Sequence, residues 1–102
     1  MKLVDMTKII RSKNAGPFHL TLDILFDSRE YFEKAKASGV LNADLISKLY
    51  QVPLEKVEFY EFDAACAFKA TLPRRIASGS PGDNDIYGSQ QHALLMNIEI
   101  PD

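Results

Sequence analysis

The residues of this chain that could do chemistry gather in or beside two polar, glycine-containing segments, residues 12–19 and 73–92. Their side chains supply guanidinium, ammonium, imidazole, hydroxyl, amide and carboxylate groups: Arg11, Lys13, Asn14, His19, Arg74, Arg75, Ser78, Ser80, Asp83, Asp85, Tyr87, Gln90, Gln91 and His92. Arginine presents a rigid fork to a carboxylate or phosphate, and backbone N–H groups freed by Gly79 and Gly82 could line an anion pocket. The two segments therefore indicate an anion-binding site. The alternative is that these residues only keep a loop soluble at the surface and cap a helix.

A metal or catalytic centre has less support. Asp83, Asp85 and His92 could bind a divalent metal, but they follow no known ligand spacing, which favours Asp85 as a helix N-cap and His92 packed on a sheet. As a general base, His92 would need a nucleophile or an oriented acid beside it, and the spacing identifies neither. We therefore expect no metal and no cofactor, and we assign no catalytic residue.

Composition bounds the class of protein. The 102 residues are 46% hydrophobic, which suits one domain over residues 1–102 with a single core. The 12 basic and 14 acidic residues leave a net charge of -2, so no overall field attracts nucleic acid or anionic lipid. No apolar run is long enough for a signal peptide or a membrane span. We expect a cytoplasmic protein that binds neither nucleic acid nor membrane.

Cys66 is the only cysteine, which excludes an internal disulfide and suits a reducing compartment. It lies in an apolar, strand-like pattern, which favours a buried, inert thiol over a reactive one.

Residues 45–53 resemble the first helix and turn of a helix-turn-helix. A basic recognition helix should follow, but residues 58–63 are acidic and strand-prone. This argues against DNA binding.

The order of elements predicts an α+β fold. Alternating apolar residues indicate an edge strand over 6–12 and strands over 20–26, 57–62, 66–72 and 96–100. Capping residues and helical spacing indicate a helix from Asp27 or Ser28 to Gly39, a helix from Asn42 to Tyr50 and a short helix over 86–95. The simplest topology is a ferredoxin-like βαββαβ fold with an additional N-terminal edge strand, and with helices on one face of a mainly antiparallel sheet. It places the loops 12–19 and 73–87 at the same end of the sheet.

The other face of that sheet needs a cover. Leu25, Tyr60 and Phe62 point away from the predicted helices, and a contiguous apolar patch usually marks an interface. We expect a partner chain or a second copy there, with a cyclic dimer as the closed form.

Four motifs carry a resemblance to a known family: residues 10–18, 67–71, 78–83 and 87–92. With the strand over 20–26, they resemble the small AtuA-related proteins, a bacterial and fungal family of unknown function. That family is similar to the C-terminal ferredoxin-like domain of the larger acyclic terpene utilisation AtuA proteins.

The resemblance implies an accessory or small subunit that acts with an AtuA-type large protein in the catabolism of organic acids or acyl-CoA derivatives. It implies no specific reaction and no catalytic residue. The positions it marks for binding an anion or a partner are Arg11, Lys13, Asn14, Gly16, Ser78, Gly79, Gly82, Asp83, Tyr87, Gln91 and His92. The alternative function is a stand-alone small-carboxylate or anion-binding protein or enzyme that uses the 12–19 and 73–92 loops.

Overall fold

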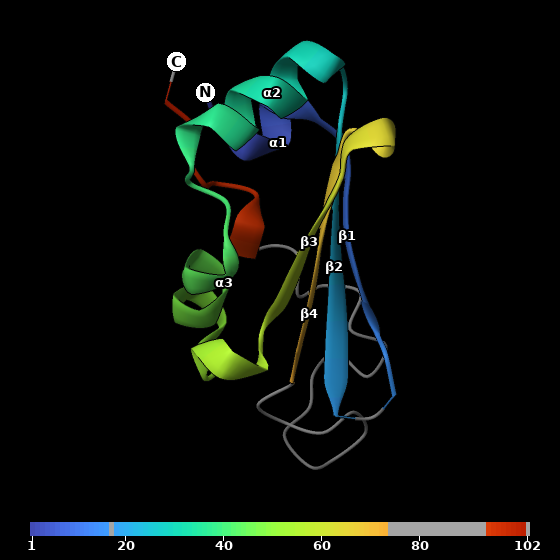
Figure 1. Cartoon of the computed structure of the whole chain (residues 1–102), viewed down its shortest axis with the longest axis vertical. Coiled ribbons are helices and arrows are strands. Elements are labelled where there is room, and N and C mark those ends of the chain that lie inside the picture. Colours follow the sequence, from blue (N-terminus) through green and yellow to red (C-terminus); the bar gives the residue numbers. More distant parts are fainter. Residues whose placement is uncertain (17, 74–93, 102) are drawn as a thin grey trace.

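The computed structural model describes residues 1–16, 18–73 and 94–101 (Figure 1). Along the chain the elements are α1 (Leu3–Met6), β1 (Thr7–Asn14), β2 (His19–Phe26), α2 (Arg29–Ser38), α3 (Ala43–Tyr50), the 3-10 turn η1 (Leu54–Lys56), β3 (Glu58–Phe62), the 3-10 turn η2 (Asp63–Ala65) and β4 (Ala67–Pro73). The α+β class is confirmed.

The strands form one four-stranded sheet in the order β1-β2-β4-β3, and each neighbouring pair is antiparallel. The predicted N-terminal edge strand is present as β1, and it extends two residues further than expected, to Asn14. The strands over 20–26, 57–62 and 66–72 are also confirmed, within one or two residues at their ends.

The ferredoxin-like arrangement is not confirmed, and the place predicted for residues 96–100 is wrong. In that topology the last strand would pair with β2, but β1 takes this position, with partners from Thr7↔Phe26 to Asn14↔Leu20. The end of the chain instead lies beside the N-terminus, where Lys2 and Glu99 form an isolated bridge. Of the helix predicted over 86–95, residues 86–93 fall outside the described residues.

Both long helices begin at a side chain that caps them, and α2 also ends at a glycine. The Ser28 hydroxyl accepts a hydrogen bond from the Tyr31 N–H at 3.2 Å, and the Asn42 side chain accepts one from the Leu45 N–H at 2.8 Å. Gly39 ends α2 at φ +69°, as its lack of a Cβ allows. The predicted caps are therefore confirmed, with Ser28 rather than Asp27 at α2.

Cys66 departs from its predicted place. The turn η2 precedes β4, and the chain leaves that turn through Cys66 at φ +52°. Cys66 is therefore half-buried at the start of the strand and not buried within it.

The core lies between the sheet and the helices. Its centre is a group of aromatic rings, with the Phe32 centroid 5.8 Å from that of Phe26 and 5.2 Å from that of Phe68. Leu3 and Ile100, from the two ends of the described chain, are fully buried in the same core. Burial of each large side chain contributes about 1.5–3 kcal/mol to folding.

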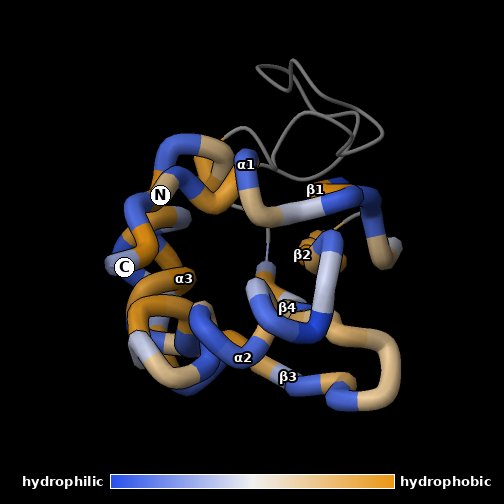
Figure 2. The backbone as a smooth tube through the Cα atoms, turned by 90° about the horizontal axis from the view of Figure 1, so that it is seen from above, coloured by the Kyte–Doolittle hydropathy of each residue, from blue (hydrophilic) through white to orange (hydrophobic). Residues whose placement is uncertain are grey.

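The sheet has two unlike faces (Figure 2). The helices lie on one side, where Leu20, Leu22 and Ile24 are almost fully buried. On the opposite side, called the open face here, Tyr60 and Phe62 of the edge strand β3 are 45% and 48% exposed, whereas Thr21 and Ala67 of the central strands are each 7% exposed. No helix of the described ranges covers the open face.

Candidate functional site

The two predicted polar segments begin to converge at one end of the sheet. His19, which closes the first segment, is the antiparallel partner of Pro73, which opens the second. This pairing confirms that the loops leave the sheet at the same end, as far as the described residues extend. The pairing follows from the β2–β4 register, which places Leu20 beside Leu72 and continues to the last residue of β4.

A cavity of about 490 Å³ lies at this end of the sheet. The β1–β2 turn, η1 and the facing ends of β3 and β4 form its wall. The residues that line it are Phe18, His19, Glu55, Lys56, Glu58, Thr71 and Pro73. It has the size of a small-molecule site, and its mouth is open to solvent.

The wall of the cavity carries both signs of charge. Lys56 and the imidazole of His19 can offer hydrogen-bond donors, whereas Glu55 and Glu58 are acceptors. Glu58 also raises the pKa of Tyr60, first through its charge, which disfavours a second anion nearby. This arrangement suits a polar or mixed-charge group better than a simple anion.

Arg11 and Lys13 lie on the open face and do not line the cavity. The Arg11 Nε donates to the Asp23 carboxylate at 3.0 Å. The Arg11 side chain is 58% exposed, but that of Asp23 only 14%, so Asp23 holds the guanidinium against the sheet. Asp23 partly neutralises Arg11, which weakens the case for Arg11 as an anion anchor.

The remaining predicted positions divide into two groups. Asn14 ends β1 half-buried, and Gly16 lies exposed in the following turn at φ +82°, a conformation that favours glycine. The other predicted binding residues lie outside the described residues: Ser78, Gly79, Gly82, Asp83, Tyr87, Gln91 and His92.

Sequence reasoning missed part of the cavity wall. No pattern in the sequence marks Glu55 and Lys56, and Glu58 and Thr71 lie within the predicted strands over 57–62 and 66–72. The hairpin register could have found the last two, because an antiparallel pairing of β3 with β4 sets Glu58 opposite Thr71. The turn η1 adds Glu55 and Lys56, and no spacing in the sequence indicated that it would fold against this end.

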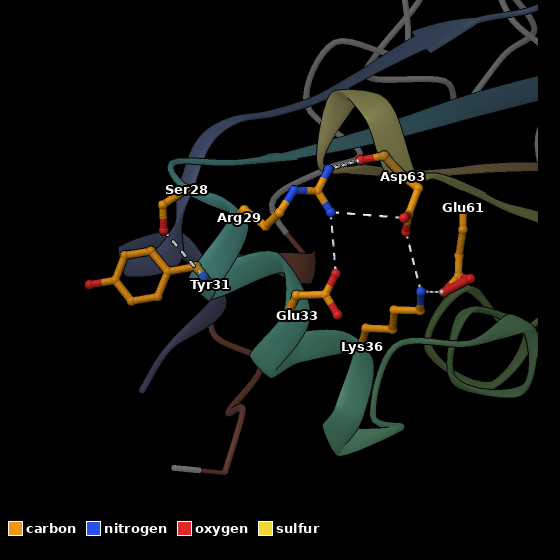
Figure 3. Close-up of polar contacts among 7 residues, drawn as sticks. All are labelled: Ser28, Arg29, Tyr31, Glu33, Lys36, Glu61 and Asp63. Carbon is orange, nitrogen blue, oxygen red and sulfur yellow. Dashed lines mark hydrogen bonds and ion pairs between the residues drawn. The ribbon is translucent and has the colours of Figure 1, made fainter.

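A second polar cluster joins α2 to the β3–β4 connection (Figure 3). Lys36 Nζ lies 3.2 Å from Asp63 and 4.0 Å from Glu61, and the hydrogen bond to Asp63 is the main cause that raises the pKa of Lys36. Arg29 donates to the Asp63 carbonyl and also pairs with Glu33 at 3.3 Å. Because each cation faces a carboxylate, this cluster fastens the helix to the hairpin.

Among the residues that the structure describes, no group of three or more His, Cys, Asp or Glu could hold a metal ion. No helix in the same part of the chain is long and apolar enough to cross a membrane.

The fold defines a small α+β protein with helices on one face of an antiparallel sheet. Residues 3–99 match a family described as "Domain of unknown function (DUF4387)", and the chain belongs to this family. No curated protein and no solved structure matches the chain.

Proposed function

We propose that this protein is a cytoplasmic accessory subunit that acts with an AtuA-type large protein in the catabolism of organic acids or acyl-CoA derivatives. The large protein binds at the end of the sheet around the cavity. The resemblance of four sequence motifs to the small AtuA-related proteins supports the identity of the partner.

The exposed Phe18 side chain is the observation that supports this docking site. Phe18, in the turn between β1 and β2, is 61% exposed at the cavity mouth. Charged side chains of η1, Glu55 and Lys56, lie around the same cavity. An aromatic anchor beside a hollow with a polar rim is the usual arrangement of a binding hot spot between proteins. Leu54, at the start of η1, adds a second apolar side chain that is 48% exposed.

Co-expression with a tagged AtuA-type large protein tests this proposal. The wild-type chain is expected to co-purify, and Phe18→Asp is expected to weaken the complex by about tenfold or more, because it removes the anchor. Phe62→Asp is the matched control, since Phe62 is also a half-exposed phenylalanine but lies at the other end of the sheet. Failure of the wild type to co-purify, or equal losses from both variants, would contradict the proposal.

A stand-alone ligand-binding protein is the second candidate, and the cavity volume favours it. About 490 Å³ falls within the range of small-molecule sites, and His19 and Lys56 could donate to a carboxylate. Glu55 and Glu58 in the same wall oppose an anion. Thermal melting across small carboxylates and CoA esters tests this function, because a ligand that binds only the folded state raises the melting temperature. Loss of the shift in His19→Ala, but not in Lys48→Ala on α3, would place the ligand in the cavity.

A further inference from the structure

The open face is ordered into three cross-strand rows. The strand register defines each row from β1 through β2 and β4 to β3. The first row is Ile9, Leu25, Ala67 and Phe62; the second is Arg11, Asp23, Lys69 and Tyr60; the third is Lys13, Thr21, Thr71 and Glu58. The first is apolar, the second joins charges with an aromatic ring, and the third has opposite charges at its two ends.

The rows give the open face a charge direction. Arg11 and Lys13 place positive charge on β1, whereas Glu58 places negative charge on β3. The Arg11–Asp23 ion pair, at 3.0 Å, joins two neighbours within the second row. The Tyr60–Phe62 ring contact, at 6.4 Å, joins the second row to the first along β3, so these side chains lie on the same side of the sheet. A second copy of this face is therefore complementary if it reverses the order of the strands.

We propose that a second copy of this chain covers the open face through a two-fold axis that runs along the strands, midway between the two sheets. This axis keeps each row over the same row of the second copy, and it exchanges β1 with β3 and β2 with β4. Lys13 then faces Glu58 of the second copy, and Asp23 faces its Lys69. Ile9 meets Phe62, and the Arg11 guanidinium lies over Tyr60, where an aromatic ring attracts a cation.

The other in-plane axis, across the strands, does not fit. It would place each strand over itself and exchange the first row with the third. Arg11 would face Arg11 and Lys69 would face Lys69, and the apolar Phe62 would face Glu58. Opposed like charges and an unpaired buried carboxylate both disfavour this packing. The charge order therefore selects one axis.

The size of the face sets the strength of the dimer. Four strands about 4.8 Å apart and three rows about 7 Å apart make a contact of roughly 20 Å by 20 Å. The contact buries roughly 800 Å² over the two copies. This is less than the roughly 1,000 Å² that stable specific interfaces exceed, so the dimer is weak and dissociates on dilution. Packed sheets cross at up to about 30°. A residue at a corner of the contact, about 10 Å from its centre, is then displaced by about 5 Å, which is less than the spacing of about 7 Å between rows.

A charge exchange tests the axis. Within one chain, Lys13 and Glu58 are three strand spacings, or about 14 Å, apart, so they do not pair with each other. Lys13→Glu and Glu58→Lys should each weaken the dimer by about tenfold or more, since each reversal opposes like charges at two symmetric contacts. The double variant Lys13→Glu/Glu58→Lys should restore it. Sedimentation velocity over a dilution series measures the dissociation constant.

Two further variants separate the outcomes. Lys48→Glu reverses an exposed charge on α3 and should leave dimerisation unchanged, and Phe62→Lys should abolish it without unfolding, because Phe62 is only half-buried. Circular dichroism checks the fold of each variant. A wild type that stays monomeric at its highest soluble concentration, a dimer insensitive to Phe62→Lys, or a double variant as weak as the single ones would overturn the proposal. This inference does not rest on the proposed function, although the third row shares Glu58 and Thr71 with the cavity wall. Dimerisation is measured without the large protein, so its failure is distinguishable from a failure of the proposed docking site.

Discussion

The two faces of the sheet differ in what covers them, although the same alternating strands form both. In β2, Leu20, Leu22 and Ile24 point to the helices and are almost fully buried. The residues between them, Thr21, Asp23 and Leu25, belong to the open face and form ordered rows with the neighbouring strands. The covered face is specified by shape, because close-packed side chains tolerate little change in volume. The open face is specified by the order of its charges and rings.

The covered face carries the aromatic packing that stabilises this small protein. Phe26, Phe32 and Phe68 hold the covered face together. Tyr60 and Phe62 also touch each other, but they keep about half of their surface exposed. Substitutions should therefore affect folding on the first face and assembly on the second.

The largest effect is expected from Phe32→Ala. Phe32 is fully buried among aromatic rings, so its truncation leaves a cavity and should lower the free energy of unfolding by about 3–5 kcal/mol. Urea denaturation followed by circular dichroism measures this change in the free energy of unfolding. A loss no greater than that of Phe62→Ala would mean that the helices are not what stabilises the sheet.

The next effect depends on pH and concerns Tyr50, at the end of α3. Burial raises the pKa of Tyr50 above its ordinary value of 10.0. Above pH 10 the unfolded chain loses this proton while the folded chain keeps it. The stability that this proton difference contributes is therefore fully present below pH 10 and is lost as the pH rises above 10.

Tyr50→Phe removes the ionisable hydroxyl, so comparing this variant with the wild type measures the contribution of Tyr50 to stability at high pH. Denaturation series at about pH 8 and about pH 11 should show the wild type losing up to about 1.4 kcal/mol per pH unit more than the variant. Parallel losses in the two proteins would show that Tyr50 ionises in the folded state as readily as in water. Exposed tyrosines such as Tyr60 are present in both proteins and cancel in the comparison.

A smaller effect is expected from Asp63→Ala, which removes the carboxylate between Arg29 and Lys36. The contacts are exposed, so the melting temperature should fall only slightly, and salt should reduce the difference because it screens exposed charges. Thermal melts at low salt and at about 1 M salt test this. Lys48→Ala, which removes an exposed ion pair within α3, is the control for a general helix-surface effect. A decrease as large as that of Phe32→Ala would place the network in the core of the fold.

The smallest effect on folding is expected from Phe62→Ala. A half-exposed side chain on the open face should change stability by less than about 1 kcal/mol in the dissociated chain. Denaturation at low protein concentration measures this without the contribution of assembly. A loss of several kcal/mol would show that the open face belongs to a continuous core, and the contrast between the two faces would fail.

Part of the candidate site followed from sequence and part did not. Topology placed the two polar loops at one end of the sheet, and the His19↔Pro73 pair bears this out at their described ends. The role of Arg11 did not follow, because only the β1–β2 register brings it to Asp23. The cavity wall also depended on η1, whose Glu55 and Lys56 carry no periodic signal.

The sequence by itself determined the local elements, because alternation and caps act over a few residues. Ser28, Gly39 and Asn42 set the helix boundaries through bonds to neighbouring backbone groups. Only the tertiary structure decided which strand pairs with the edge of β2 that β4 leaves free. Residues 7–14 and 96–100 both have strand-like patterns, and the pattern within either segment does not record which of them pairs with the free edge of β2. β1 takes that edge because a short turn joins it to β2, so pairing costs little loop entropy, and the chain end is left to bridge to Lys2.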